Sequence, residues 1–372
     1  MAIENVEVPA AQLRELVTNV FSAAGCSAEE SARVAKYLLE ASLTGHDSHG
    51  VIRVPRYIQM LRDEMIFADR KVELLVDKPA YAVVDGKHGF GQTAAEQATR
   101  IGIDKCKLSG LSAVALRNAG HAGRIADWAE MAAAEGLVSV HFVNGAGSVL
   151  VTPFGSFEKR FSTAPYCVGV PVAGAPPLIL DFATSIVAEG KVMVASQGGK
   201  PLRPDALVSP DGQPSADPQV LYGEYDRLGP RDPRKGEGAI RSFGEHKGSG
   251  LAMMCEMLGG ALTGNGCTKP GKNFTNGMFS FYVDPACFDP EGMFPEEVTR
   301  YIRFVKEAKP IEPGGETLVP GEPELRSKAR RLKNGVPVSV NTWDAIVETA
   351  RSVGVDERII EASIKSARRA DS

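Results

Sequence analysis

Short apolar runs alternate with helical stretches between residues 81 and 143, and this alternation constrains the fold more than any other feature of the sequence. Apolar strands followed by amphipathic helices are typical of an α/β layer, in which helices cover a sheet. The predicted elements are a strand over 81–85, a turn over 88–91, a helix over 92–108, a strand over 112–117, a helix over 123–135 and a strand over 137–143. Three later apolar runs add strands at 166–171, 178–182 and 278–283.

Helical patterns occupy both ends of the chain. Residues 9–43 carry apolar side chains at helical spacing, and Ser27 is placed to start the second helix of this segment. The tail from Glu322 returns to helical patterns, and residues 249–263 predict one further helix. Residues 198–242 are rich in Gly, Pro, Asp and Arg, which predicts long connections at the surface.

Composition excludes several classes of protein. The chain has 372 residues and a formal net charge of -4, without a basic cluster that would suit a nucleic acid. Its six cysteines are scattered and form no CxxC pair, which favours buried thiols in a reducing compartment. No secretory signal is visible, and no apolar run reaches the roughly 20 residues of a membrane helix. We therefore expect a cytoplasmic globular protein with no membrane or nucleic-acid partner.

A glycine-rich segment after one predicted strand is the first candidate for dinucleotide binding. Gly145 and Gly147 begin a GxGxxG-like pattern, but its third glycine is replaced by Leu150. Pro153 interrupts the helix that should offer its N-terminus to a pyrophosphate. An ordinary Rossmann site is therefore not expected, and a dinucleotide would have to bind in another way.

The segment His46-Asp47-Ser48-His49-Gly50 concentrates titratable groups. A histidine such as His49 is suited to giving a proton to a carbonyl, and the hydroxyl of Ser48 can fix its tautomer. Arg53 lies one turn further on if the segment is helical, and its guanidinium suits a substrate carboxylate. A helix cap with a structural histidine, or a metal site built on the two histidines, would also account for these residues. We expect no metal.

Three more motifs lie where α/β proteins bind ligands. Asn118–Arg124 is a loop after a strand, and its Gly120 and Gly123 would allow a close backbone approach. Asp181–Ser185 ends a strand, and its acid could hold a ribose hydroxyl, orient a histidine or simply cap a helix. Gly244–Gly250 opens a helix with glycines and a lysine, a combination that suits phosphate but does not match a Walker A sequence.

Taken together and in this order, these motifs resemble one family closely. The segments that carry the resemblance are HDSHGVIRVPRYI, RNAGHAGRIADWAEMAAAEGLVSVHFVN, PFG, LILDFATSIVAEGKV, EHKGSGLAMMCEMLGGALTG and VPGEPE. They are similar to the type 2 malate/L-lactate dehydrogenase family, which is distinct from the Rossmann-type lactate and malate dehydrogenases. Within that family the chain most resembles the bacterial hydroxycarboxylate dehydrogenases.

The resemblance implies an α/β fold with a non-Rossmann NAD(P)-binding sheet domain, like that of sulfolactate dehydrogenase, and a helical domain. Residues 1–78 together with 320–372 would form the helical domain for substrate binding and dimerisation. Residues 79–319 would form the mixed-sheet domain. The resemblance also implies a homodimer and the use of NAD or NADP.

The resemblance assigns roles to particular residues. His49, with Ser48 beside it, would donate the proton, although His121 matches the acid/base of other members; Asp181 joins the catalytic set. Arg53 would bind the substrate carboxylate, with Thr163 also at the substrate. The expected cofactor contacts are His121, Ala122, Gly123, Arg124, Ile125, Asn144, Leu180, Asp181, Phe182, Ala183, Thr184, His246, Lys247, Gly321 and Glu322. Arg124 and Arg203 are candidates for reading a 2′-phosphate.

Three departures from the family pattern affect these expectations. Ala164 stands where members often have Asn, which removes one amide near the substrate or nicotinamide. Ser249 stands where members often have Tyr. Lys191 occupies the place of an acid in the ketimine reductases, which favours a hydroxy acid over an imine as the substrate.

We therefore predict an NAD(P)-dependent 2-hydroxy acid dehydrogenase that transfers a hydride between NAD(P)H and a small 2-oxo acid. We expect His49 rather than His121 to move the proton, because Ser48 and Arg53 share its segment. One alternative is a cyclic ketimine reductase acting on piperideine- or pyrroline-2-carboxylate. An alternative of another class is a non-catalytic dinucleotide-binding homologue, against which the set of His49, Arg53, His121 and Asp181 argues.

Overall fold

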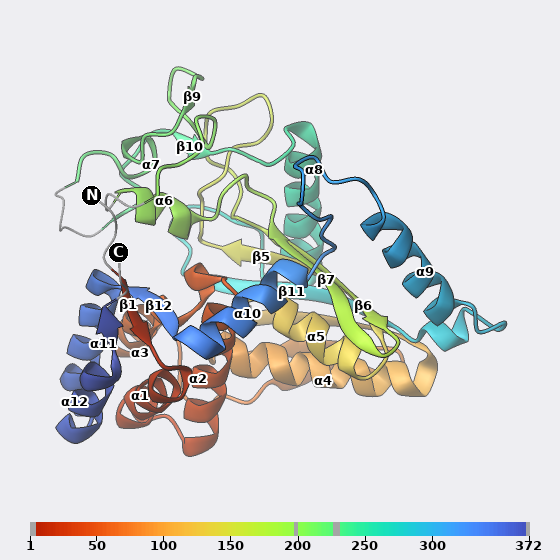
Figure 1. The fold of residues 1–372 in the computed structure, drawn as a ribbon, viewed down its shortest axis with the longest axis horizontal. Coiled ribbons are helices and arrows are strands. Elements are labelled where there is room, and N and C mark those ends of the chain that lie inside the picture. The colour runs from red at the N-terminus through yellow and green to blue at the C-terminus, as the bar shows by residue number, and fades with distance from the viewer. Residues whose placement is uncertain (1–4, 197–199, 226–230, 370–372) are drawn as a thin grey trace.

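The computed structural model describes residues 5–196, 200–225 and 231–369. Figure 1 shows that the first and last elements of the described chain meet in one helical region beside a large sheet. The elements of the helical region are β1 (Asn5–Val8), α1 (Ala10–Ala23), α2 (Ala28–Leu43), α3 (Val54–Arg62), α10 (Glu322–Asn334), β12 (Val336–Ser339), α11 (Val340–Val353), α12 (Glu357–Ser366) and β13 (Arg368–Arg369).

The helices at the chain ends form where the sequence predicts them. Side chains Leu13, Leu16 and Val20 of α1 are fully buried, which confirms the helical spacing. Ser27 caps α2, because its side chain accepts a hydrogen bond from the Glu30 backbone N–H at 3.2 Å.

The small sheet of the helical region was not predicted. Strand β1 lies between β12 and β13 and is antiparallel to both. Because strands of four residues or fewer show almost no alternation, the sequence pattern gave no sign of this closure.

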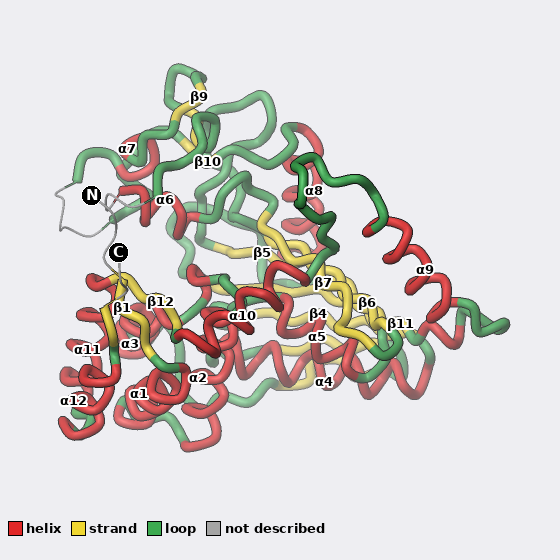
Figure 2. The backbone as a smooth tube through the Cα atoms, viewed as in Figure 1, coloured by secondary structure: helices red, strands yellow, loops and turns green. Residues whose placement is uncertain are grey.

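The large sheet is mixed, with only one parallel pair of strands. Its order is β2-β3-β4-β11-β5-β6-β7, and only β3 and β4 run parallel. The strands are β2 (Glu73–Lys78), β3 (Tyr81–Asp85), β4 (Leu111–Ala119), β11 (Thr275–Val283), β5 (Val138–Ala146), β6 (Pro165–Val172) and β7 (Ala175–Ala183). This mixed α/β architecture confirms the non-Rossmann expectation, because the connection between β5 and β6, which contains Gly147, has no helix (Figure 2).

Helices cover both faces of the large sheet (Figure 1). Helices α4 (Gly91–Ser109) and α5 (Ala126–Ala134) pack on one face. Helix α8 (His246–Cys255) and the π-helical turn η3 (Glu256–Leu262) pack on the other. The predicted helix over 249–263 is therefore present, but it changes its hydrogen-bonding pattern midway. Helix α9 (Phe294–Lys306) lies near β6, in the Pro- and charge-rich segment where no element was predicted.

The expectation of long connections over 198–242 holds for most of the segment, because its regular elements are only two to four residues long; residues 198–199 and 226–230 lie outside the described residues. The segment contributes to a third lobe with its own apolar core, which includes Leu207, Leu221, Tyr222 and Ile240. The elements of this lobe are α6 (Glu189–Ser196), β8 (Leu207–Val208), β9 (Pro214–Ser215), α7 (Gln219–Tyr222) and β10 (Ala239–Ile240).

Separate apolar cores accompany these regions. One cluster joins the first and last helices, and another lies between the large sheet and helices α4 and α5. The division at 78/79 and 319/320 stays a prediction. Within the described part of the chain, no helix combines the length and apolarity needed to cross a bilayer.

Candidate active site

The segment 46–53 folds as two tight turns rather than one helix. Turns η1 (Asp47–His49) and η2 (Val51–Arg53) are 3₁₀ turns, separated by Gly50, whose backbone is extended. Gly50 leaves no room for a side chain, because a Cβ would meet Ser42. The expectation that Arg53 lies one helical turn from His49 is therefore wrong in detail. Arg53 instead folds back, and its Nε donates to the Ser48 carbonyl at 2.6 Å.

Helix α10 holds this segment from the other end of the chain. The guanidinium of Arg331 bonds to both carboxylate oxygens of Asp47 and to the Ser42 carbonyl. Nε2 of His46 lies 3.4 Å from a carboxylate oxygen of Glu324. These contacts fix the turns from which His49 projects.

The structure brings His49 and His121 together. Nδ1 of His49 lies 3.2 Å from Nε2 of His121, and the two rings are nearly parallel, with 4° between their planes. The sequence presented these histidines as rivals for one role, but they form a hydrogen-bonded pair. Asp181, expected beside them, makes no hydrogen bond to either ring; its carboxylate accepts from the Ala126 backbone N–H at 2.8 Å and so caps α5.

The pair continues into α3 and α4. The hydroxyl of Tyr57 lies 2.6 Å from Nδ1 of His121. The side-chain amide of Gln92, at the start of α4, donates to the Tyr57 hydroxyl at 3.0 Å. Tyr57 and Gln92 are 3% and 1% exposed, so this chain of hydrogen bonds is shielded from water along its inner half.

Burial and positive neighbours keep both histidines neutral. Burial first, and then the charge of Arg53, lowers the pKa of His49 to about 3. The same two causes lower the pKa of His121 well below its ordinary value. Burial raises the pKa of Tyr57 to about 12, so its hydroxyl keeps its proton at neutral pH.

Arg53 is a cation without a carboxylate partner in the part of the chain that the structure describes. Its Nε bonds to a backbone carbonyl, and no described residue bonds to its two terminal nitrogens. These nitrogens form the planar fork that binds a carboxylate through two parallel hydrogen bonds. Arg53 also lies close enough to lower the pKa of both histidines. It can therefore hold an acid beside the histidine pair.

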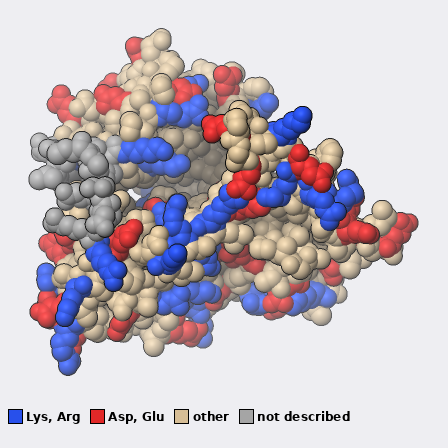
Figure 3. All heavy atoms as spheres, in the orientation of Figure 1, with Lys and Arg blue, Asp and Glu red and all other residues tan. Residues whose placement is uncertain are grey.

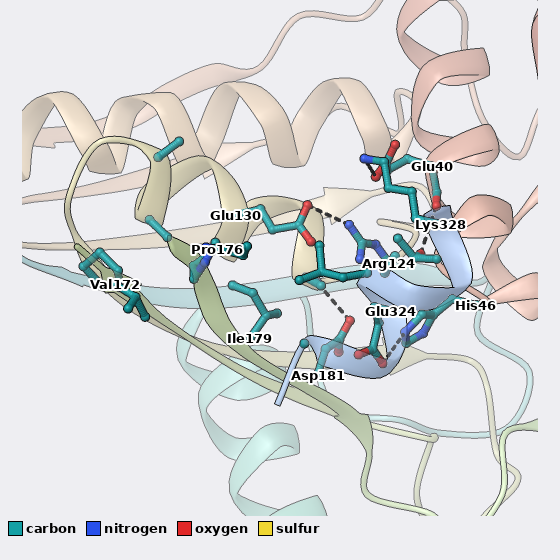
Figure 4. A pocket seen from close by; sticks show the side chains of 18 of the residues that line it. Glu40, His46, Arg124, Glu130, Val172, Pro176, Ile179, Asp181, Glu324 and Lys328 are labelled. Atoms are coloured by element: carbon teal, nitrogen blue, oxygen red, sulfur yellow. Dashed lines mark hydrogen bonds and ion pairs between the residues drawn. The ribbon is translucent and has the colours of Figure 1, made fainter. Parts of the chain in front are cut away.

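A pocket of about 360 Å³ lies beyond the histidine segment. Figure 4 shows its walls, to which α2, α5, β7 and α10 contribute. Among the expected site residues it gathers Arg124, Asp181 and Gly321, together with His46. Gly321 precedes α10 and lies against β7, and its φ of 96° is a backbone conformation that favours glycine. On the face drawn in Figure 3, the surface is hollowed between α10 and the third lobe, and Lys and Arg line much of the rim.

Arg124 forms ion pairs inside the protein. Its guanidinium bonds to Asp127 at 2.6 Å and to Glu130 at 2.8 Å, and its side chain is fully buried. Only Nη1 lacks a partner among the described residues. The other candidate, Arg203, pairs with Asp205 at the surface. Since carboxylates already balance both cations, neither has the free charge expected of a 2′-phosphate reader.

Gly120 and Gly123, in the loop 118–124, lie against other parts of the protein and do not border open space that a ligand could occupy. A Cβ on Gly120 would lie 2.7 Å from the Gly89 carbonyl, and one on Gly123 would lie 3.2 Å from the Gln92 amide. The prediction that these glycines serve a ligand is therefore wrong for Gly120, whose close approach is to the loop before α4. Ala122 is likewise engaged, because its N–H donates to Asn276 at 2.8 Å.

Other expected contacts are tied up by neighbours. Asn144 is buried and bonds to Glu256, Asn265 and the Gly266 carbonyl. The Glu322 carboxylate bonds to Lys306 and to the Val319 N–H. The side chains of Asn144 and Glu322 therefore bond to other parts of the protein, and these bonds join separate elements of the fold.

The remaining expected contacts differ in accessibility. Leu180 is exposed on β7, and Phe182 and Ala183 follow it, partly buried. Thr184 is buried and bonds to the carbonyls of Thr163 and Ala164. Ile125 is buried. His246 and Lys247 are exposed at the start of α8, where the His246 ring meets Phe154.

Ala164 shows what the departure from the family pattern costs. Its φ is 35°, in the left-handed region that Asn adopts more readily than Ala. With Ala at this position, the chain lacks the polar side chain of Asn and also a residue that adopts this backbone conformation readily.

Sequence reasoning missed Tyr57, Gln92, Glu324 and Arg331. Tyr57 lies at the end of the segment that begins with His46, but an aromatic residue at helical spacing is usually predicted to be a core residue. The other three are polar residues on helices, and nothing local distinguishes them from solvated side chains. Only the tertiary structure reveals their partners.

The sheet architecture defines a non-Rossmann α/β protein, and the pairing of His49 with His121 gives it a candidate acid/base site. A family model described as malate/L-lactate dehydrogenase matches residues 8–347. The chain therefore belongs to the malate/L-lactate dehydrogenase family, whose members are oxidoreductases, as the sequence predicted.

Individual relatives agree. The chain is 36% identical to hydroxycarboxylate dehydrogenase B of Escherichia coli K12, over 94% of this chain and 95% of that protein. It is 30% identical to a pyrroline-2-carboxylate/piperideine-2-carboxylate reductase of Pseudomonas putida, over 92% of this chain and 96% of that protein. A solved structure of a putative malate/lactate dehydrogenase from E. coli superimposes with a TM-score of 0.89 at 35% identity, covering 96% of this chain and 98% of that one.

Proposed function

We propose that this protein is an NAD(P)-dependent 2-hydroxy acid dehydrogenase that interconverts a small 2-hydroxy acid and its 2-oxo acid. The observation that carries the proposal is the pairing of His49 with His121 beside Arg53, a cation that has no carboxylate partner among the described residues. An acid/base group next to an unpaired guanidinium suits a substrate that carries a carboxylate and a reactive oxygen. The family and its dehydrogenase relatives support the same reaction class.

Each residue has a defined task. Arg53 binds the substrate carboxylate through its two terminal nitrogens. His49 uses Nε2, to which no described residue bonds, to give a proton to the carbonyl oxygen during reduction or to remove one during oxidation. His121 sits behind His49 and holds its ring through the 3.2 Å contact, and Ser48 fixes Arg53 through its carbonyl. A nicotinamide cofactor, when bound, supplies or accepts the hydride at C2.

The pocket beyond His46 fits the cofactor. Its carboxylates Glu40, Glu130, Asp181 and Glu324 are acceptors for ribose hydroxyls, and its cations are already paired. This donor and acceptor set favours NAD over NADP, because a 2′-phosphate would meet carboxylates without a free cation. We further propose a homodimeric, cytoplasmic enzyme, in keeping with the resemblance and with six cysteines that are all free.

Two alternatives have distinct signatures. A ketimine reductase would use the same histidine pair, and the Pseudomonas putida relative makes it a real competitor. Lys191 argues against it, because the backbone next to Lys191 packs on the catalytic segment: a Cβ on Gly190 would lie 2.8 Å from the Ser48 Cβ. At the position where the reductases have an acid, this chain has an exposed lysine. A non-catalytic homologue has no need of the unpaired Arg53.

The decisive experiment follows NADH and NADPH oxidation with pyruvate, oxaloacetate, phenylpyruvate and piperideine-2-carboxylate. We expect turnover of at least one 2-oxo acid, and losses of about 100-fold or more in kcat for His49→Ala. His121→Ala should also lose activity, whereas His88→Asn, at an exposed turn with a φ of 56°, should not. Turnover of the imine far above every 2-oxo acid would favour the reductase. Cofactor binding without any turnover would favour the non-catalytic homologue.

A further inference from the structure

The hydrogen bonds behind His49 form one directed chain. Gln92 Nε2 donates to the Tyr57 hydroxyl, which therefore directs its own proton to His121 Nδ1, 2.6 Å away. His121 is neutral and has one ring proton, which must then sit on Nε2 and point at His49 Nδ1. His49 in turn carries its proton on Nε2, the nitrogen without a partner among the described residues. The chain thus sets the tautomer of the ring that would meet the substrate.

The neutrality of His49 creates a chemical problem that this chain solves. A neutral imidazole is a very weak acid unless its other nitrogen gains a proton as the first is lost. Burial first, and then the neighbouring Arg53, His46 and Arg124, lower the pKa of His49 to about 3. At neutral pH an imidazolium is therefore scarce, and the proton that leaves Nε2 must be replaced at Nδ1.

We propose that Tyr57, held by Gln92, is a positioning residue that fixes the tautomers of His121 and His49 and supplies the replacement proton through His121. The proposal rests on the dehydrogenase function proposed above. It adds two residues, from α3 and α4, that need not touch the substrate.

The proton steps balance. When C2 of the 2-oxo acid gains hydride, the carbonyl π electrons move to oxygen, and this oxygen takes the proton of His49 Nε2. His49 Nδ1 takes the proton of His121 Nε2, and His121 Nδ1 takes the proton of the Tyr57 hydroxyl. Tyr57 is left as a phenolate that accepts from Gln92. After the hydroxy acid leaves, one proton from water enters at His49 Nε2 and returns the chain to its starting state.

The surroundings of Tyr57 are suited to this role rather than to solvent exchange. Its ring packs against Phe21 and Phe90, and its hydroxyl has no contact with any described carboxylate. A phenol with a raised pKa is still more acidic than an alcohol, so transfer toward an alkoxide runs downhill. In oxidation the chain first releases one proton to water from His49 Nε2, which leaves Tyr57 as a phenolate and both rings protonated at Nδ1; the same steps run backward then take the alcohol proton at His49 Nε2.

The test is Tyr57→Phe, which keeps the ring and removes only the hydroxyl. We expect kcat for reduction to fall about 10- to 100-fold, with KM for NADH changed less than about twofold. Tyr37→Phe is the matched control, because Tyr37 is another buried tyrosine, whose hydroxyl bonds to Glu96, one turn along α4 from Gln92, and not to either histidine. It should keep wild-type kcat.

The pH profile separates a relay from a purely structural effect. Wild-type kcat for reduction should be nearly flat from pH 8 to pH 6. In Tyr57→Phe the reaction depends on the rare imidazolium, so kcat should rise as the pH falls, by up to tenfold per unit. A Tyr57→Phe enzyme with wild-type kcat and a flat profile would overturn the relay while leaving the dehydrogenase function intact. Wild-type protein inactive on every 2-oxo acid would overturn both.

A second variant covers the case in which Tyr57→Phe does not fold. Gln92→Met removes the donor to Tyr57 at similar volume, and we expect a smaller loss, about three- to tenfold, in kcat. Unchanged circular dichroism and NADH affinity would establish that the fold is intact. A Gln92→Met enzyme with intact fold and unchanged kcat would contradict the role of Gln92 in directing the chain.

Discussion

Gly91, the first residue of α4, lies against the backbone of His121, and replacing it by Ala should damage the histidine pair without contacting either ring. A Cβ at Gly91 would overlap the His121 carbonyl and lie 2.5 Å from the Ala122 nitrogen. Because carbon rests at about 3.5 Å from such atoms, the loop must move by roughly 1 Å. Overpacking of this kind costs about 1–3 kcal/mol, and a shift of 1 Å at a catalytic group costs about 100-fold in rate.

The assay measures both quantities on the same protein. Urea unfolding followed by circular dichroism gives the free energy of unfolding, and initial rates of NADH oxidation give kcat. Gly250→Ala is the control, because its helix position has no atom within 4 Å of the added Cβ and should gain about 0.5–1 kcal/mol. A Gly91→Ala protein within about 0.5 kcal/mol and twofold in kcat of wild type would refute the reasoning.

Three further predictions follow from buried charge and from the pocket. Arg124→Leu leaves Asp127 buried and unpaired, so urea unfolding should show a loss of about 3–5 kcal/mol, much of which Arg124→Leu/Asp127→Leu should restore; an unchanged single variant would mean that water solvates the acid. Burial lowers the pKa of His141 to about 3. Below pH 6.5 the unfolded chain therefore binds a proton at His141 that the folded protein does not bind, and the free energy of unfolding should decrease as the pH is lowered. His141→Gln should remove about 1.4 kcal/mol per pH unit of that slope between pH 6 and pH 5, and an identical slope would show that His141 does not contribute. KM for NADPH should exceed KM for NADH at least tenfold, and Glu130→Gln should narrow the gap; equal values would mean that the ribose phosphate lies elsewhere.

Local patterns predicted the parts of the fold that depend on local physics. The alternation over 81–143 matches β3, α4, β4, α5 and β5, because each element buries one face that the sequence marks periodically. Helix α9 could have been read as well: Pro295 stands in its first turn, with Glu296 behind it and Lys306 in its last turn, which are ordinary helix signals.

The site was predictable only in part, because its decisive contacts join distant segments. The His46–Arg53 cluster stood out as chemistry, yet the partner of His49 is 72 residues away and that of Asp47 is 284 residues away. Spacing along one segment suggested that Arg53 and His49 share a helical face, and the 3₁₀ turns broke that geometry. Resemblance could name His121, but it gave no reason to expect Tyr57 behind it.

The pairing of β1 with β12 and β13 sets the order in which the enzyme can be completed. On the ribosome, Asn5–Val8 must wait for Val336–Ser339, a delay on the order of half a minute at 5–20 residues per second. Arg331 emerges just before that partner strand, so Asp47 is unsupported for most of synthesis. The large sheet can form meanwhile, whereas the turns that carry His49 gain their support near the end. A nascent chain stalled before residue 331 should therefore lack the assembled site.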